Sequence, residues 1–400
     1  MAKKRILLIW ELGAGMGHTS RLRPLAERVM SLGHEVTCTA IREKDAARHL
    51  PCPVEEAPWL KAPKRKQPVT WVGHLADTLA ALGWSQTDHL RESVRRWRAV
   101  LIDEKPDLIV MDSAPTAMLA SLGLPMQRVW LANHWSTPPR VKPIPDLQKE
   151  LTGQNRPIPD TEPAVVEAIN ACLNEQDQPT ITHLYELFDR ADDSPMLSIP
   201  EIDPHGPRPQ TEYLGVWASP SGAAPPWPTC EHGPDTPGVF AYLKPFPHRG
   251  ATLQLLAQTG LPVQAYTPGL NDIEAKPAGS SNLKCHTSPI DWLAKQQSTA
   301  FILCHGGAGM TGQALQLGLP VLALPTSLEQ SAVTLRASQT GACIGTNIQD
   351  IRSIGSALEQ MFSDDGVFEA AEKLGEKYAS YSPGQAAIQL ADRLTGLVAD

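Results

Sequence analysis

The sequence predicts an α/β protein with two domains, each built on a parallel sheet. Strand-like and helix-like segments alternate from the start of the chain, as in parallel α/β sheets, and the alternation resumes after a stretch crowded with proline. A chain of 400 residues exceeds what one hydrophobic core usually serves. We therefore expect a first domain over residues 1–200, a linker over 201–237, a second domain over 238–383 and a final helical segment over 384–400.

Short apolar runs and the residues that bound them indicate the elements of the first domain. The predicted strands are residues 6–10, 35–40, 108–111 and 126–131. Residues 20–32 are a predicted helix that ends at Gly33, because glycine accepts the left-handed conformation common after a helix. Residues 52–100 and 136–195 have no regular pattern, and we expect them to hold insertions over the sheet.

Proline marks the boundary between the predicted domains. Prolines are frequent between residues 195 and 237, and proline interrupts both helices and central strands. The second domain then follows with a strand over 238–243, a helix over 252–258 and a strand over 263–266. Apolar residues at helical spacing predict a last helix over 384–397.

Composition limits the partners and the compartment. The formal charge of −8 argues against nucleic acid as the main partner. Seven cysteines stand singly, without a Cys-x-x-Cys pair, which is typical of reduced thiols in a cytoplasm. The apolar run over 6–10 is too short for a signal peptide, and no later run approaches a membrane span. We expect a soluble, cytoplasmic protein without integral membrane association.

A glycine loop in the second domain indicates anion binding. A predicted buried strand over 301–304 runs into the loop His305-Gly306-Gly307-Ala308-Gly309, and a predicted helix follows over 310–317. Glycines let a backbone approach a ligand closely, and the free amides and dipole of a helix N-terminus attract phosphate. A further strand over 321–324 is followed by Glu329 and Gln330, which we expect at the same edge of the sheet.

This segment resembles the donor-binding segment of GT-B glycosyltransferases. The pattern is His-Gly-Gly-x-Gly, then Ala-Leu, Gly-x-Pro, Pro, and an acidic residue followed by Gln. It is most similar to family 1, the UDP-glycosyltransferase and macrolide glycosyltransferase type. The resemblance implies two Rossmann-like domains whose parallel sheets face a central cleft, with the final helix returning to the first domain.

The resemblance also implies roles for single residues of the second domain. The residues implied to bind the donor diphosphate are His305, Gly306, Gly307, Ala308 and Gly309. Those implied for the nucleoside are Ser288, Ile290 and Gln313, and those for the sugar are Glu329 and Gln330. Two alternatives stay open: the loop is a tight turn that serves packing alone, and Glu329 is a first-turn acid favoured by the helix dipole.

Two positions depart from the family pattern. Met310 stands where the family has Ser or Thr, and Gln313 stands where it has a Glu that binds the ribose hydroxyls. A Gln carbonyl accepts hydrogen bonds without the assistance of a charge. We expect the two changes to weaken nucleotide binding by about 1–3 kcal/mol without abolishing it.

A second glycine loop follows the first strand and ends in a histidine. Its order is Gly-x-Gly-x-Gly-His over residues 13–18, whereas a dinucleotide fingerprint is Gly-x-Gly-x-x-Gly. The second strand ends without the acid that binds the ribose of NAD, although Arg42 leaves NADP as an alternative. The family resemblance instead implies that His18 is the general base, oriented by Asp112 at the end of a later strand.

The chemistry of hydroxyl transfer explains such a pair. A hydroxyl is a poor nucleophile at neutral pH, and an imidazole with a pKa near 6.5 takes its proton as the new bond forms. A carboxylate on the other ring nitrogen fixes the tautomer. The alternatives are that His18 bonds only to the loop backbone and that Asp112 caps the helix after it.

The resemblance places the acceptor pocket in the first domain. The residues implied to line it are Gly17, Trp71, Trp84, His134 and Trp135, and ordinary core and rim packing is the alternative for them. No His/Cys cluster has zinc spacing, and no Asp-x-Asp follows a strand to hold Mg²⁺ on a diphosphate. We therefore expect transfer without a metal or other cofactor.

The sequence thus predicts an inverting, metal-independent hexosyltransferase. The expected partners are a nucleotide-sugar donor, a UDP-sugar first and a dTDP-sugar as the other possibility, and a small-molecule acceptor with a hydroxyl group. Met310 and Gln313 keep two alternatives open. One is a nucleotide-sugar-binding partner protein with reduced transfer, and the other is a nucleotide-sugar epimerase on the same fold.

Overall fold

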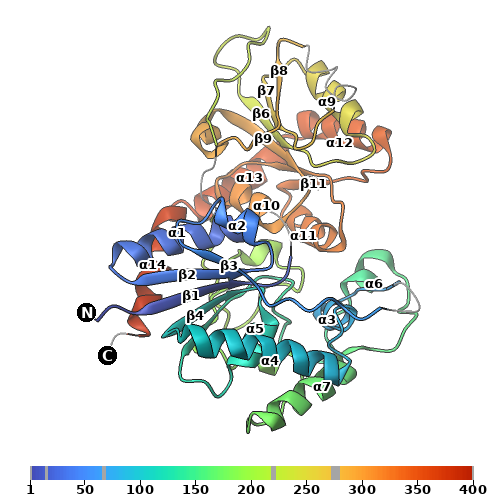
Figure 1. Ribbon diagram of the computed structural model, residues 1–400. Helices are drawn as coiled ribbons and strands as arrows, with labels where there is room; N and C mark the ends of the chain where they lie inside the picture. The colour runs from blue at the N-terminus through green and yellow to red at the C-terminus, as the bar shows by residue number, and fades with distance from the viewer. Residues whose placement is uncertain (1, 14–16, 65–68, 218–221, 272–279, 399–400) are drawn as a thin grey trace. The chain divides into compact units, whose positions relative to one another are not determined.

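The chain forms two compact units in a computed structural model (Figure 1). The structure describes residues 2–13, 17–64, 69–217, 222–271 and 280–398. The first unit comprises Met1–Leu197, Arg208–Ser219 and Ser382–Asp400, and the second comprises Ser198–Pro207 and Pro220–Tyr381. The proline-rich stretch is therefore divided between the two units, and the chain passes from one to the other more than once.

The first unit is built on a parallel five-stranded sheet in the order β3-β2-β1-β4-β5. Its strands are β1 Arg5–Trp10, β2 Glu35–Ala40, β3 Val54–Glu56, β4 Leu108–Asp112 and β5 Gln127–Leu131. Its helices are α1 Gly17–Ser31, α2 Glu43–Ala47, α3 Leu75–Ala81, α4 Thr87–Glu104, α5 Pro115–Ser121, α6 Leu147–Thr152, α7 Glu162–Glu175, α8 Tyr185–Phe188 and α14 Pro383–Gly396. The sheet puts the ends of β1 and β4 side by side.

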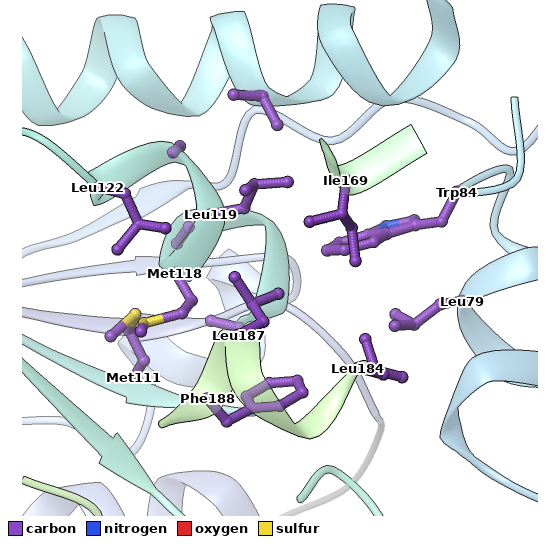
Figure 2. Close-up of a cluster of buried hydrophobic side chains, with 14 of the residues drawn as sticks. Leu79, Trp84, Met111, Met118, Leu119, Leu122, Ile169, Leu184, Leu187 and Phe188 are labelled. Atoms are coloured by element: carbon purple, nitrogen blue, oxygen red, sulfur yellow. The ribbon is translucent and has the colours of Figure 1, made fainter. Parts of the chain in front are cut away.

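Alternate residues of β1 serve two hydrophobic cores, one on each face of the sheet. Ile6 and Leu8 belong to the core that also contains residues of α1 and α14. Leu7 and Ile9 belong to the core on the other face, with residues of α3, α4, α5, α7 and α8. Figure 2 shows part of this second core. Burial on both faces is the usual state of a parallel sheet.

The last helix completes the core around α1. Leu390 and Leu394 of α14 are buried, and α14 packs against α1. At the rim, the Arg28 guanidinium donates two hydrogen bonds to the Asp392 carboxylate, at 2.8 and 3.1 Å. The helix that carries His18 is therefore held in place partly by α14.

Two long helices lie largely within residues 52–100 and 136–195, the segments that have no regular sequence pattern. Helix α4 covers 18 residues and α7 covers 14. In α4 the buried residues are Leu90, Val94, Trp97 and Leu101, spaced so that they share one face. The other faces of α4 carry many arginines and acidic residues. The narrow apolar stripe is therefore difficult to recognise in the sequence.

The second unit is built on a parallel six-stranded sheet in the order β11-β10-β9-β6-β7-β8. Its strands are β6 Gly238–Tyr242, β7 Val263–Tyr266, β8 Leu283–His286, β9 Thr299–Cys304, β10 Val321–Ala323 and β11 Cys343–Gly345. Its helices are η1 Pro200–Ile202, α9 Arg249–Gln258, η3 Leu293–Ser298, α10 Ala308–Gln316, α11 Leu328–Ser338, α12 Ile351–Ser363 and α13 Asp365–Lys377. The predicted α/β class with parallel sheets is confirmed.

Helix α9 begins three residues before the predicted helix over 252–258. The cause is Arg249, whose side chain is buried although it is charged. Its guanidinium donates to the carbonyls of Pro268 and Gly269, at 2.8 and 3.0 Å, in the loop after β7. Such a buried arginine is stable only when its donors are satisfied, and no pattern of apolar residues reveals it.

No helix in the described ranges combines the length and the apolar character that crossing a membrane requires.

Candidate functional site

The end of the first sheet brings His18 and Asp112 into contact. Trp10 of β1 and Asp112 of β4 are partners in the sheet register. His18 is the second residue of α1, and its ring stacks on Trp10 with centroids 4.8 Å apart. His18 Nδ1 lies 3.0 Å from Asp112 Oδ2, and the Asp112 side chain is fully buried. The two residues that the sequence predicts as a pair therefore meet.

The other ring nitrogen of His18 lies against Gly13. A Cβ atom on Gly13 would stand 2.5 Å from His18 Nε2, and Gly13 has a φ of +94°. Both the space and the backbone angle require glycine here. Glycine at this position thus leaves room for the imidazole, whose side chain is 12% exposed.

Arg21 is a member of this cluster that the sequence analysis missed. Its Nη2 lies 3.0 Å from both carboxylate oxygens of Asp112 and 3.1 Å from His18 Nδ1. Burial alone would raise the pKa of Asp112, but the charges of Arg21 and His18 lower it below its usual value. The signal in the sequence was the three-residue spacing of His18 and Arg21, which puts both on one face of a helix.

A second buried carboxylate, Glu11, follows β1 directly. Its Oε2 accepts hydrogen bonds from the backbone amides of Thr116 and Ala117, at 2.8 and 3.4 Å. Burial raises the pKa of Glu11 to about 7, although hydrogen bonds from Thr116, Ala117 and Trp97 oppose the shift. This side chain therefore changes its charge within the neutral pH range.

Glu11 also lines a small pocket of the first unit. The other residues around it are Leu12, Pro58, Trp59, Leu60, Leu82, Trp84, His89, Ser93, Trp97 and Thr116. The cavity measures about 10 Å³, the space of about one water molecule. Its walls combine tryptophan rings with Glu11 and His89 as the ionisable groups.

Of the five residues expected to line an acceptor pocket, only Trp84 lines the cavity just described. Trp71 is buried and donates through Nε1 to Asp146 at 2.8 Å, and Trp135 donates to the Thr78 hydroxyl at 3.3 Å. Trp71 thus bonds to the N-cap residue of α6, and Trp135 bonds to a residue of α3.

The other two expected acceptor residues lie at different depths. Gly17 is exposed at the first position of α1, where a side chain would meet open space. His134 is buried, and its backbone carbonyl accepts a hydrogen bond from Arg208 at 3.3 Å.

The glycine loop of the second unit lies between β9 and α10. Gly306 has a φ of +69°, and a Cβ atom on it would collide with the Thr334 hydroxyl. Gly307 is the N-cap residue of α10, so Ala308 and Gly309 form its first turn. Their backbone amides are the unpaired donors of a helix N-terminus. The predicted strand, loop and helix are thus present.

His305 is bound to the backbone through both ring nitrogens. Its Nδ1 donates to the Leu324 carbonyl at 2.9 Å, and its Nε2 accepts from the Lys244 amide at 2.8 Å. These two bonds require a neutral ring, and burial lowers the pKa of His305. The side chain joins the ends of three neighbouring strands, β6, β9 and β10. The ring could form a hydrogen bond to a phosphate only if its bond to the Leu324 carbonyl or to the Lys244 amide were broken.

Two further polar residues lie close to this loop. Gln313 follows it in the chain, and the Lys244 amide is bonded to His305. Gln313 lies on α10 and is 2% exposed, and its amide nitrogen has no hydrogen-bond partner among the described residues. Lys244 is exposed, and its ammonium group lies over the Tyr242 ring, 5.7 Å from the centroid. The sequence analysis missed Lys244, although its place two residues after β6 was a signal.

The remaining donor residues occupy other strand ends of the same sheet. Ser288 and Ile290 follow β8, the edge strand, which is separated from β9 by β6 and β7. Glu329 is exposed in the first turn of α11. Gln330 Oε1 accepts hydrogen bonds from the Thr326 amide and hydroxyl, at 2.8 and 2.7 Å.

Across the described ranges, no three His, Cys, Asp or Glu side chains are gathered as a metal ion would need.

No protein-family model matches the chain. Among curated proteins, it is 25% identical over 330 residues to a PGL/p-HBAD biosynthesis glycosyltransferase of Mycobacterium tuberculosis, a match that covers 73% of this chain and 71% of that protein. It is 28% identical over 211 residues to a PGL/p-HBAD biosynthesis rhamnosyltransferase of Mycobacterium bovis, over 49% of this chain and 44% of that protein.

Solved structures of glycosyltransferases share the whole fold. The calicheamicin glycosyltransferase CalG4 is 19% identical, with a TM-score of 0.70 over 100% of both chains. The glycosyltransferase VinC, solved in complex with DTDP, is 18% identical, with a TM-score of 0.64 over 97% of this chain and 100% of that one. The predicted resemblance to GT-B glycosyltransferases and the predicted fold are confirmed.

Proposed function

We propose that this chain, a glycosyltransferase with the GT-B fold, transfers a hexose from a nucleotide-sugar donor to a hydroxyl of a small-molecule acceptor, with inversion at the anomeric carbon. The observation that carries the proposal is the 3.0 Å contact between His18 Nδ1 and Asp112 Oδ2 at a strand end. A base and the carboxylate that orients it are what deprotonation of a hydroxyl requires.

The proposed reaction moves one proton and one sugar. With Nδ1–H donated to Asp112, the Nε2 lone pair of His18 takes the acceptor's hydroxyl proton. The acceptor oxygen forms a bond to the anomeric carbon from the face opposite the leaving group. The bond from that carbon to the diphosphate oxygen breaks, and the nucleoside diphosphate leaves. His18 ends as an imidazolium ion beside the Asp112 carboxylate, which stabilises it.

The second unit is the proposed donor site. The backbone amides of Gly307, Ala308 and Gly309 and the dipole of α10 face the diphosphate, because a helix N-terminus attracts anions. The exposed Lys244 ammonium adds a positive charge. These groups stabilise the leaving diphosphate without a metal ion in this proposal. In this proposal His305 does not contact the diphosphate. It positions the loop by its hydrogen bonds to the backbone after β6 and β10.

Gln313 is proposed to meet the nucleoside, together with Ser288 and Ile290. Its buried amide nitrogen lacks a partner among the described residues, and an orphaned buried donor is costly unless a ligand satisfies it. Glu329 and Gln330 are proposed to hold the sugar hydroxyls. A DTDP-bound structural neighbour and a rhamnosyltransferase relative support including dTDP-deoxysugars beside UDP-hexoses as donors.

The test measures nucleotide release from UDP- and dTDP-sugars with a panel of phenol and alcohol acceptors. Wild-type protein is compared with His18→Ala and with a matched control, His49→Ala, whose histidine lies just after α2 in the same unit. We expect activity in wild type and His49→Ala, and a loss in His18→Ala. Equal turnover in all three proteins would remove His18 from the mechanism.

The same samples separate the alternative functions. Calorimetric titration with UDP and dTDP measures binding by itself. Binding without turnover across the acceptor panel would favour a partner protein, for which Met310 and Gln313 are the motivation. Interconversion of donor sugars with no acceptor present would favour an epimerase.

A further inference from the structure

One nitrogen of Arg21 is shared between the two members of the His18–Asp112 pair. Arg21 Nη2 has two protons, and three acceptor atoms lie within 3.1 Å of it: both Asp112 oxygens and His18 Nδ1. His18 Nδ1 in turn lies 3.0 Å from Asp112 Oδ2. The three groups therefore compete for the same hydrogen bonds.

Only one of two proton arrangements can exist at His18 Nδ1 at any time. If Nδ1 carries the proton, it donates to Asp112, and the Nε2 lone pair is free to act as a base. If Nδ1 is unprotonated, it accepts from Arg21, and the proton sits on Nε2, which then cannot take another. The second arrangement also turns the Nδ1 lone pair toward the Asp112 carboxylate. Arg21 thus bears directly on the tautomer that the proposed reaction needs.

We propose that Arg21 is a positioning residue that holds Asp112 as an anion and competes with it for His18 Nδ1, and so sets the pH at which His18 works as a base. This inference rests on the proposed role of His18. It concerns a residue that touches neither substrate and acts through its two neighbours.

The surroundings of His18 leave few other sources of charge. Among the described residues in contact with the ring, Asp112 comes from β4 and Arg21 from its own helix, while Trp10 of β1 is uncharged. Asp112 also accepts a 3.4 Å hydrogen bond from the Ser113 hydroxyl. A cation next to a carboxylate weakens the help that the carboxylate gives to a neighbouring imidazolium. Removing the Arg21 charge therefore makes His18 easier to protonate.

The position of the Arg21 guanidinium permits both proton arrangements of His18. Its contacts with the pair run through Nη2, and its buried Nε has no partner in the described part of the chain. The helix does not depend on the side chain either, because the Arg21 backbone carbonyl is what accepts from Trp217 Nε1 at 3.3 Å. Substitution of the side chain keeps this link to the rest of the first unit.

The experiment records kcat/KM against pH for wild type, Arg21→Met and Arg21→Lys. We expect Arg21→Met to move the acidic limb of the profile upward by about one pH unit, because Asp112 then stabilises the imidazolium alone. Arg21→Lys keeps the charge and stays near wild type. KM for the nucleotide sugar stays constant, since the second unit binds it.

Arg23→Met is the matched control, because Arg23 lies on the same helix but bonds to Glu27 at its surface. It should leave the profile in place. An unchanged acidic limb in a folded Arg21→Met protein would overturn the inference, as would an equal shift in Arg23→Met.

A second measurement is independent of turnover. Histidine-labelled protein reports the titration and tautomer of His18 by NMR, with His18→Gln used to assign the signal. We expect the midpoint of the His18 titration to rise in Arg21→Met by the same amount. If His18→Ala keeps full transfer activity, the proposed role of His18 as the base fails although transfer itself is retained. The NMR result then decides alone whether Arg21 acts on the His18 ring. If His18→Ala is inactive and the Arg21→Met midpoint does not move, only the inference about Arg21 fails.

Discussion

Each unit has a histidine near a glycine loop at the end of a central strand, and the two histidines have opposite partners. His18 is bound by side chains: its Nδ1 contacts Asp112 and Arg21, and its ring lies on Trp10. His305 is bound by the backbone: its ring nitrogens contact the Lys244 amide and the Leu324 carbonyl.

The kind of partner decides what each ring is able to do. The Lys244 amide and Leu324 carbonyl are fixed by their strands, so His305 is locked in one neutral tautomer. The partners of His18 are instead the charged side chains of Asp112 and Arg21, and each competes for its Nδ1. A ring whose partners are backbone groups and a ring whose partners are charged side chains look alike in the sequence, since each is a histidine beside glycines.

The largest expected difference between the two is catalytic. We expect His18→Ala to lower kcat for transfer by about 10²–10⁴, the usual contribution of a general base. Its affinity for UDP and dTDP stays that of wild type, because the proposed donor residues lie in the second unit. Steady-state kinetics and calorimetry on one preparation check both parts. A weaker nucleotide affinity with unchanged kcat would contradict the division of roles.

Glu11 gives the first unit a pH dependence of its own. Its pKa is raised from 4.5 to about 7, so its stabilising contribution is complete below about pH 4.5 and is lost as pH rises to about 7. The loss reaches about 3.5 kcal/mol at most, because the pKa rises from 4.5 to about 7 and one pKa unit corresponds to about 1.4 kcal/mol.

The isosteric variant Glu11→Gln tests this dependence. The variant carries no charge at any pH, so its stability relative to wild type should improve steadily between pH 4.5 and 7. Urea unfolding across this range measures the difference. A constant difference between the two proteins would show that Glu11 does not titrate there.

For His305 the expected effect is on stability. We expect His305→Ala to destabilise the second unit by about 2–4 kcal/mol, because it removes the hydrogen-bond partner of both the Lys244 amide and the buried Leu324 carbonyl. Hydrogen exchange at β6 and β10 measures this. The same measurement at β1 and β4 in His18→Ala should show little change.

The pH response of His305 has the opposite sign to that of Glu11. Its folded pKa lies below the usual 6.5, so its contribution is present above about pH 6.5 and is lost as pH falls through the folded pKa. Protection of β6 should therefore decline on acidification in wild type but not in His305→Ala.

The smallest expected effect concerns the loop itself. Gly306→Ala should cost about 1–3 kcal/mol, from its positive φ and from the collision with the Thr334 hydroxyl. The double variant Gly306→Ala with Thr334→Ala removes the collision and keeps the strained backbone. Unfolding of the single and double variants separates the two causes. Equal losses would assign the whole cost to φ.

The strands, and the residues that lie at their ends, could be predicted from the sequence. Residues 35–40 and 263–266 were predicted as strands with the observed bounds, because short apolar runs have clear limits. The meeting of His18 and Asp112 was also predictable, since adjacent parallel strands end at one edge. Arg21 was not foreseen. Its place in the cluster depends on how α1 is turned, which residue types alone do not fix.

Backbone partners are the least visible in a sequence. Every residue has an amide and a carbonyl, so nothing in the letters around His305 predicts that Lys244 and Leu324 would occupy both of its nitrogens. Helix α4 was missed for another reason, because its apolar stripe is narrow and charged residues dominate its composition.

The helix α14 has a consequence for how the protein is made. Its Leu390 and Leu394 lie in the same core as Leu22 and Leu25 of α1. On a ribosome, α14 emerges only after residues 32–382 have followed α1. The helix that carries His18 must therefore keep part of its apolar face uncovered until α14 has been made. A fragment that ends at residue 200 contains the whole first sheet but lacks α14, and with it part of the core around α1.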